Sequence, residues 1–308
     1  MKHAIVTGAT GFVGRWLIRE LLESGVAVTA VVRPDSANLR LLPTLGDLRT
    51  VECPMDGYDA LPALLSPQPD CVFYHLAWAG VSGSDRASLA VQQANVTAAV
   101  VSVSAAKALG CRAWAGLGSI MEQEAAAVTA ADGSVPGMGY LYGEAKHFAH
   151  LATKAQAAAL GIPHLWPMLT NAYGEYEYSP RFLNSTLRKI LHHEPLEFTA
   201  GTQNYDFIHV EDAARALCAV GERGQSGCAY LIGSGAPASL RSFVERLGRT
   251  LAPEQPLHFG SVPYTGAQLP LSAFSIQKLT ADTGFVPQIS FEDGLRRTMD
   301  WIMKTEET

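Results

Sequence analysis

The feature that most constrains this chain is a run of closely spaced glycines directly after its first apolar segment. Residues 3–7 form a strand-like apolar run, residues 8–14 read G-x-x-G-x-x-G, and residues 15–24 carry apolar side chains at helical spacing. Such glycines let the backbone turn tightly and bring a pyrophosphate to the N–H groups of a helix N-terminus. The spacing also fits a glycine-rich turn of another α/β protein. The predicted dinucleotide contacts of this loop are Gly8, Thr10, Gly11, Phe12, Val13 and Gly14.

Strand and helix patterns alternate through the first half of the chain. This alternation predicts an α/β fold with a Rossmann-like, doubly wound parallel sheet and helices on both faces. The expected strands are 2–7, 26–33, 49–53, 70–77, 112–118 and 163–170, and the expected helices are 12–24, 87–109 and 141–160.

The rhythm breaks after about residue 172, and proline and glycine punctuate the rest of the chain. We expect helices at 180–193, 211–222, 239–251 and 291–304 and short strands at 196–199 and 229–232. Residues 1–172 are therefore predicted to form the dinucleotide-binding domain. Residues 173–308 mainly form a smaller α/β substrate-binding lobe, with 205–223 packing back on the first domain.

Composition excludes several partners. The chain has 308 residues, 48% of them hydrophobic, and a net charge of −6 without a basic stripe, so we expect no nucleic acid. We expect no run that spans a membrane and, with a strand expected from residue 2, no signal peptide. The five cysteines lack C-x-x-C spacing, which favours free thiols in the cytoplasm over a metal site.

Two of the expected helices, 87–109 and 141–160, are rich in alanine. Alanine is the best helix former, so propensity alone explains this composition. Small side chains also permit close packing against a second copy of the chain. We therefore expect a homodimer formed through these helices.

Tyr142 and Lys146 lie four residues apart, which places them on one face of the expected helix. A nearby ammonium favours the phenolate and lowers the pKa of the tyrosine. Such a tyrosine can exchange a proton with a carbonyl or alcohol oxygen while a hydride moves to or from a nicotinamide. Ser119 follows the strand 112–118, at the sheet edge where parallel sheets hold ligands, and could bind the same oxygen. Taken separately, the pair also fits a solvated helix face and the serine a loop cap.

With these residues in order, the chain resembles the extended short-chain dehydrogenase/reductase family over nearly its whole length. Residues 75–77 (His-Leu-Ala) resemble the family segment that passes the cofactor, and residues 171–174 and 206–212 match its N-x-Y-G and D-[FY]-[IV]-H-V-x-D segments. Asn95 matches the asparagine that helps hold the active-site helix and its lysine. The resemblance implies catalysis by Ser119, Tyr142 and Lys146. It adds Leu76, Ala77, Asn95, Tyr142 and Lys146 to the cofactor contacts.

The cofactor type is read from the end of the second strand. NAD enzymes of this fold usually carry an acidic residue there, whereas an arginine accommodates the 2′-phosphate of NADP. Arg33 holds that position, 25 residues after Gly8, and could bond the phosphate and stack on adenine. NADP(H) is therefore favoured. NAD(H) is the alternative, with Arg33 facing solvent and Asp35 binding the ribose.

Within the family, residues 180–184 and 201–206 are most similar to sugar-nucleotide epimerases and keto-sugar reductases. The resemblance suggests a nucleotide-linked sugar as the small-molecule partner. Sugar-nucleotide enzymes often carry an arginine directly before the D-[FY]-[IV] segment, where this chain has Tyr205, and another ahead of the last helices, where residues 264–275 contain none. These differences weaken the expected binding of a diphosphate. The predicted substrate contacts are Glu122, Asn171, Arg181, Tyr205 and Arg241.

The favoured function is an NADPH-dependent reductase of a 4-keto sugar nucleotide. Ile120 and Met121 stand where dehydratases carry an Asp-Glu pair, which argues against dehydration. A sugar-nucleotide epimerase with retained NAD(P) uses the same residues and stays open. So does a ketone or aldehyde reductase without a nucleotide substrate. A non-catalytic NADP(H)-sensing module is the alternative of another class, and the Tyr142/Lys146 pair speaks against it.

Overall fold

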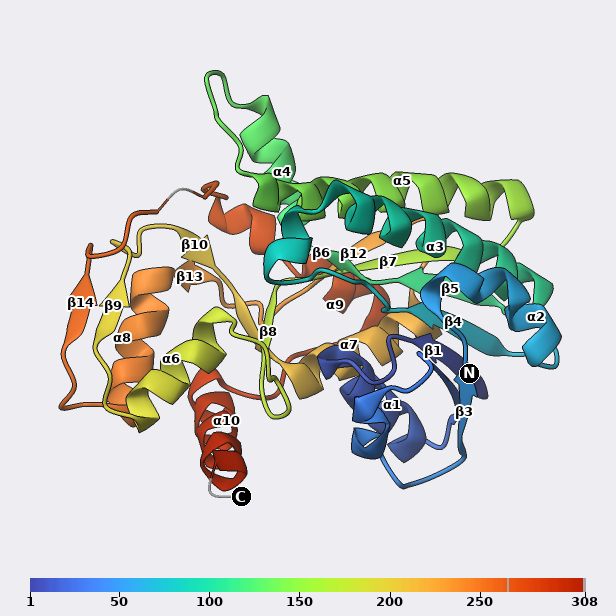
Figure 1. The fold of residues 1–308 in the computed structure, drawn as a ribbon, viewed down its shortest axis with the longest axis horizontal. Coiled ribbons are helices and arrows are strands. Elements are labelled where there is room, and N and C mark those ends of the chain that lie inside the picture. Colours follow the sequence, from blue (N-terminus) through green and yellow to red (C-terminus); the bar gives the residue numbers. More distant parts are fainter. Residues whose placement is uncertain (265, 307–308) are drawn as a thin grey trace.

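A parallel sheet forms the centre of the molecule in the computed structural model, which describes residues 1–264 and 266–306. The strand order is β3-β2-β1-β4-β5-β7-β12, and β6 pairs with β7 (Figure 1). This order reverses direction between β1 and β4, as in doubly wound sheets. The predicted fold class is confirmed. The strands are β1 His3–Thr7, β2 Ala27–Val32, β3 Leu48–Glu52, β4 Cys71–His75, β5 Ala113–Gly116, β6 Gly118–Ser119, β7 His164–Leu169 and β12 Ala229–Ile232.

Helices cover both faces of the sheet because its strands are apolar on both sides. In β1, Ile5 packs toward one face, while Ala4 and Val6 pack toward the other. The first face carries α2 (Leu61–Leu64), α3 (Leu89–Ala108) and α5 (Leu141–Leu160); the second carries α1 (Phe12–Glu23), α7 (Val210–Arg223) and α9 (Gln277–Thr283). Figure 1 shows α3 and α5 side by side above the sheet.

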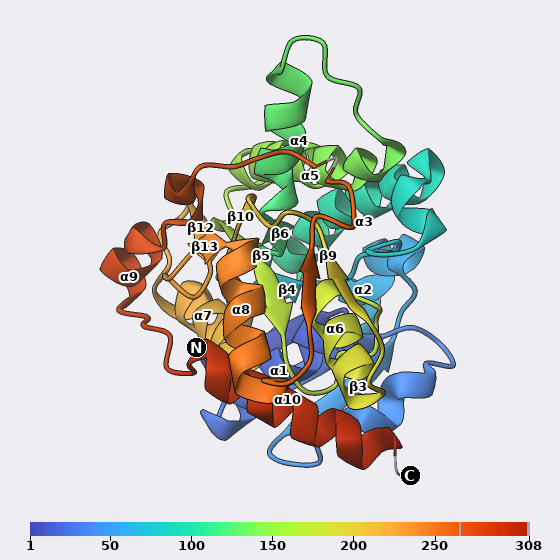
Figure 2. The ribbon, with the colours of Figure 1, turned by 90° about the vertical axis from the view of Figure 1, so that its left-hand side faces the viewer.

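A smaller lobe lies beside the carboxyl ends of the strands (Figures 1 and 2). Its core combines aliphatic side chains with a group of aromatic rings, and those of Phe207 and Phe243 meet edge to face with their centroids 5.0 Å apart. Such pairs add stability beyond their buried area. The elements of this lobe are α6 Phe182–Leu191, β9 Leu196–Phe198, β10 Asn204–Tyr205, β13 Ala238–Ser239, α8 Leu240–Leu251, β14 Leu257–Phe259 and α10 Phe291–Glu306.

The chain passes between the two lobes more than once. Strand β8 (Asn171–Tyr173) pairs with β11 (Phe207–His209), after which α7 packs on α1 and β12 joins the main sheet. The division into 1–172 and 173–308, with 205–223 packing back, stays a prediction. Residues 265, 307 and 308 of the predicted second lobe lie outside the described residues.

Two features differ from the sequence expectations. Residues after Ser119 form a helix, α4 (Met121–Ala130), where no helix was predicted. By length and composition, α3 is apolar enough to cross a membrane, although no such run was expected. Half of α3 is buried, and it packs against α5 and the sheet as a core helix does.

Asp212 provides a test of how α10 is attached to the sheet domain. Its buried carboxylate accepts hydrogen bonds from the backbone N–H groups of Gln288 and Ile289 and pairs with Arg215. We expect Asp212→Ala to lower the free energy of unfolding by about 2–4 kcal/mol, because several charge-assisted hydrogen bonds are lost. The control Asp47→Ala removes an exposed carboxylate and should cost less than about 1 kcal/mol in urea unfolding. Equal effects would contradict this role.

Candidate active site

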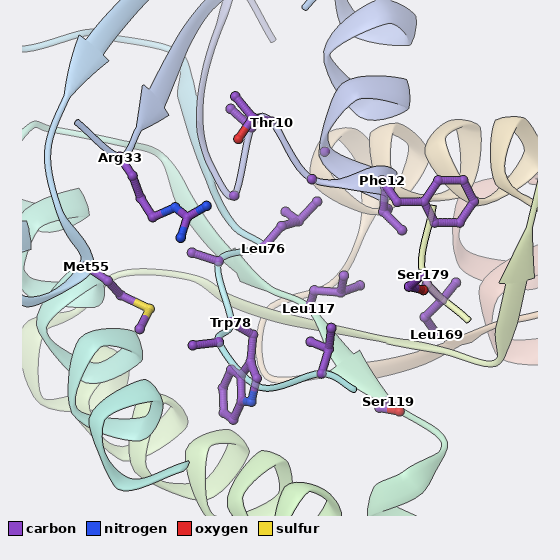
Figure 3. A pocket seen from close by; sticks show the side chains of 18 of the residues that line it. Thr10, Phe12, Arg33, Met55, Leu76, Trp78, Leu117, Ser119, Leu169 and Ser179 are labelled. Atoms are coloured by element: carbon purple, nitrogen blue, oxygen red, sulfur yellow. The ribbon is translucent and has the colours of Figure 1, made fainter. Parts of the chain in front are cut away.

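A cavity of about 460 Å³ lies at the point where the strand order reverses. Its walls come from the β1–α1 loop, the end of β2, the segment after β4 and the start of α5. In Figure 3, Thr10, Arg33 and Trp78 surround this space from three elements. The predicted residues that line it are Gly8, Thr10, Gly11, Phe12, Val13, Gly14, Arg33, Leu76, Ala77, Ser119, Tyr142, Lys146 and Arg181.

The glycines of the loop are required by close backbone contacts. Gly8 has φ +68°, and a Cβ there would lie 2.6 Å from the Ala77 nitrogen. A Cβ on Gly14 would lie 2.2 Å from the Gly8 carbonyl oxygen. The loop is therefore folded tightly at the N-terminus of α1, which is the geometry a pyrophosphate needs. The residues present thus fit a dinucleotide.

Tyr142 is half-buried, near the start of α5, and its side chain lines the cavity. Burial raises the pKa of Tyr142, whereas the positive charges of Arg181 and Arg86 and hydrogen bonding with Ser119 lower it. The net result is a pKa above the ordinary value of tyrosine, so the predicted lowering by Lys146 is wrong. Arg181 and Arg86 are the cations that oppose the rise. The phenol therefore stays protonated at neutral pH, as a proton donor must be.

Lys146 is only 4% exposed and makes two contacts. Its Nζ donates a hydrogen bond of 2.6 Å to the Leu117 carbonyl oxygen and lies 3.7 Å from the centre of the Trp78 ring. Burial lowers the pKa of Lys146 to about 7, while the Glu122 carboxylate acts in the opposite direction. Trp78, which the sequence analysis did not select, directly follows the His-Leu-Ala segment. The ring face stabilises an ammonium that burial would otherwise neutralise.

Two α3 side chains hold the segment after β4 in place. Asn95 is fully buried behind the cavity wall, where its amide donates to the Ala79 carbonyl and accepts from the Ala79 N–H. Gln92 accepts a hydrogen bond from Trp78 Nε1. Asn95, predicted as a cofactor contact, does not itself line the cavity; it orders the segment after β4 that does.

Glu122 also differs from its predicted role as a substrate contact. The first turn of α4 directs its carboxylate inward, where it accepts from the Ser119 backbone N–H at 2.8 Å and from Trp166 Nε1 at 3.1 Å. His150 Nδ1 lies 3.6 Å from the same carboxylate. Glu122 is 5% exposed, and its carboxylate fixes the backbone of Ser119 through the hydrogen bond from the Ser119 N–H.

A second cavity of about 370 Å³ continues from the first toward the smaller lobe. Ser119, Tyr142 and Arg181 line both cavities, and Asn171 and Tyr205 line the second. Two of the three predicted catalytic residues, Ser119 and Tyr142, therefore lie where the two cavities meet, and Lys146 lines the first cavity alone.

Arg241, by contrast, lies on the surface of α8. Its guanidinium lies 4.1 Å from the centre of the Phe259 ring and pairs with Glu245, so the predicted substrate contact is corrected. Glu177, which was not predicted, lines both cavities, and its Oε2 lies 3.6 Å from Arg181 Nε. Arg86, in the wall of the second cavity, was not predicted either. Neither residue stands in a motif that could have revealed it.

Residues 4–233 match the sequence model of the NAD dependent epimerase/dehydratase family. A dTDP-glucose 4,6-dehydratase of Neisseria meningitidis is 26% identical, over 98% of this chain and 94% of that protein. A 2-alkyl-3-oxoalkanoate reductase of Stenotrophomonas maltophilia is 28% identical, over 95% of this chain and 97% of that protein.

Solved structures share the fold over the whole chain. A UDP-glucose 4-epimerase of Thermotoga maritima, solved with UDP-glucose, has a TM-score of 0.81 at 19% identity, covering 99% of both chains. The Bordetella bronchiseptica enzyme WbmF, solved with NADH, has a TM-score of 0.80 at 24% identity, covering 99% of this chain and 93% of that one. These similarities establish the architecture.

The buried ammonium predicts how stability depends on pH. The folded pKa of Lys146 is about 7, below its ordinary 10.5, so the folded state holds a costly charge below pH 7. Between pH 7 and 10.5 the unfolded chain binds more protons, and stability rises with pH. We expect Lys146→Met to be more stable than the wild type at pH 6, by at most about 5 kcal/mol at about 1.4 kcal/mol per pKa unit. The advantage should shrink toward pH 10 in urea unfolding. A pH-independent difference would contradict the buried charge.

Proposed function

The chain belongs to the NAD-dependent epimerase/dehydratase family, and from this premise we propose that it is an NADP(H)-dependent reductase of the 4-keto group of a nucleotide-linked sugar. It is an enzyme of the extended short-chain dehydrogenase/reductase class. The observation that carries the proposal is the position of Tyr142 and Ser119 in the walls of both cavities. A carbonyl placed at this junction reaches a proton donor and the cofactor space together.

In the proposed reaction, Tyr142 Oη gives its proton to the carbonyl oxygen of the substrate. Ser119 Oγ donates a hydrogen bond to the same oxygen, and its backbone is held by Glu122. Lys146, which lines the first cavity, holds a ribose hydroxyl of the dinucleotide. When bound, the nicotinamide supplies the hydride. Asn171, Arg181 and Tyr205 line the second cavity and are proposed to bind the rest of the substrate.

Reduction is favoured over dehydration by the segment after Ser119. Ile120 is buried and carries no acidic group, and the Glu122 carboxylate points into the core. This segment therefore places no carboxylate beside the substrate carbonyl. An epimerase with retained NAD(P) would use the same three residues without net consumption of NADPH. Measurement of NADPH oxidation with sugar nucleotides therefore separates these two activities.

A second candidate function is the reduction of a keto acid without a nucleotide. Similarity to the Stenotrophomonas reductase over 95% of this chain favours it. The same Tyr142, Ser119 and Lys146 would act on that carbonyl. The two candidates differ in what fills the outer part of the second cavity, since only a sugar nucleotide brings a diphosphate to Arg181.

We propose NADP(H) as the preferred cofactor because Arg33 directly follows β2 and points into the cavity (Figure 3). Its charge complements a 2′-phosphate, which NAD lacks. Arg33→Ala should weaken NADPH binding by about 10- to 100-fold, the worth of a charge-assisted pair, and NADH binding far less. Fluorescence titration measures both constants, with Arg40→Ala as the control. Tighter binding of NADH by the wild type, or equal losses for both cofactors, would contradict the preference.

Tyr142→Phe tests the proposed proton donor. The substitution removes one oxygen and should reduce carbonyl reduction by about 10²- to 10⁴-fold while NADPH binding is retained. Steady-state turnover and cofactor titration are measured together. Activity that survives the change would exclude this mechanism, and a wild type that binds NADPH but reduces no carbonyl would favour the sensing module.

A homodimer and a cytoplasmic location are also proposals. The outer face of α5 exposes Phe148 by 60% and Leu151 by 64%, which supports a paired interface beside the alanine-rich α3. A monomeric sedimentation coefficient at micromolar concentration would contradict the dimer.

A further inference from the structure

Arg86 is a charged residue in the wall of the second cavity that the proposed reaction does not use. It lies in a single 3₁₀ turn, η3 (Ser84–Ala87), between β4 and α3. Its guanidinium carbon is 4.8 Å from the centre of the Tyr142 ring. A group bound to Arg86 would therefore lie next to the carbonyl that Tyr142 protonates.

The position of Arg86 is fixed by the buried Gln92 of α3. The Gln92 side-chain nitrogen donates to the carbonyl oxygens of Gly80, Asp85 and Arg86, at 3.3–3.4 Å. The Arg86 Nε also donates to the Gly139 carbonyl oxygen at 3.2 Å. The guanidinium is thus held in place before any substrate binds, which limits the entropy lost on binding.

The terminal nitrogens of Arg86 have no hydrogen bond or ion pair within the described part of the chain. Among the described residues that line this cavity, the other charged ones are Glu177 and Arg181, which lie 3.6 Å apart and balance each other. Glu124 is the acid close enough for Arg86 to lower its pKa, yet burial raises that pKa to about 7. Among the described residues no carboxylate forms an ion pair with Arg86, so its guanidinium charge can meet that of a ligand.

We infer that Arg86 binds a carboxylate that the substrate carries beside the carbonyl presented to Tyr142. The planar guanidinium can donate two parallel hydrogen bonds to a carboxylate, which a neutral substituent cannot accept as strongly. The substrate is then a keto acid, either a nucleotide-linked sugar with a carboxylate or a free oxo acid. The inference rests on the proposed function only in placing the carbonyl at Tyr142.

Two matched pairs of probes test this subsite on the full chain saturated with NADP⁺. UDP-glucuronate and UDP-glucose differ in a carboxylate on the sugar, and 3-oxodecanoate differs from its methyl ester in charge. Isothermal titration gives the dissociation constant of each. The wild type should bind the acid of at least one pair about 10- to 100-fold more tightly than its neutral partner.

Variants assign that preference to Arg86. Arg86→Gln should abolish it, and Arg86→Lys should retain part of it, because the charge remains but the planar fork is lost. Arg249→Gln removes an exposed arginine outside both cavities and should leave the preference unchanged. Thermal unfolding of each variant shows whether it is folded. If Arg86→Gln is not folded, the partial loss of preference in Arg86→Lys provides the test.

Each outcome decides the inference. Equal binding within both pairs, or a preference that survives Arg86→Gln, overturns it and leaves the sugar-nucleotide reductase standing if UDP-glucose binds. A preference confined to the oxo-acid pair, with neither sugar nucleotide bound, supports the Arg86 subsite and contradicts the nucleotide-linked substrate. Tighter binding of UDP-glucuronate than of UDP-glucose supports both the Arg86 subsite and the nucleotide-linked substrate.

Discussion

The close approach of two backbone turns, one after β1 and one after β4, is the constraint on which the site depends. Gly8 adopts a left-handed conformation and leaves no room for a side chain against Leu76 and Ala77. Gly14 lies equally close to the Gly8 carbonyl at the start of α1. These contacts open the cavity between β1 and β4 while aiming the helix N-terminus into it. A larger side chain at either position would push these backbone segments apart and disrupt the glycine loop that is predicted to bind the pyrophosphate.

Buried charged side chains near Tyr142 then influence the protonation of the groups in and beside the first cavity. Lys146 and Glu122 are both almost fully buried, and the Glu122 carboxylate acts to raise the pKa of both Lys146 and Tyr142. The Lys146 ammonium is supported by a carbonyl oxygen and the Trp78 ring, and the Glu122 carboxylate by N–H donors. Buried charges with such partners are fixed in place, which is what a proton donor requires from its surroundings.

The parts of the site that could be predicted are those encoded by residues close together in the sequence. The glycine loop, the alternation of strands and helices, and the four-residue spacing of Tyr142 and Lys146 are local signals, and the structure brings their residues into one cavity. Trp78, Arg86 and Glu177 lie in connecting segments whose paths depend on tertiary contacts, so no periodicity could place them. Glu122 was misassigned because the sequence does not show that a helix begins at Met121 and turns the carboxylate inward.

The central claim is that the Tyr142 hydroxyl faces a nicotinamide ring across a shared substrate space. A crystal structure of the protein with NADP⁺ tests this most directly. The account predicts the pyrophosphate on the glycine loop, the nicotinamide at the junction of the two cavities, and the phenol oxygen beside it within reach of Ser119. A nicotinamide bound elsewhere, or a phenol turned away from it into the protein, would contradict the account.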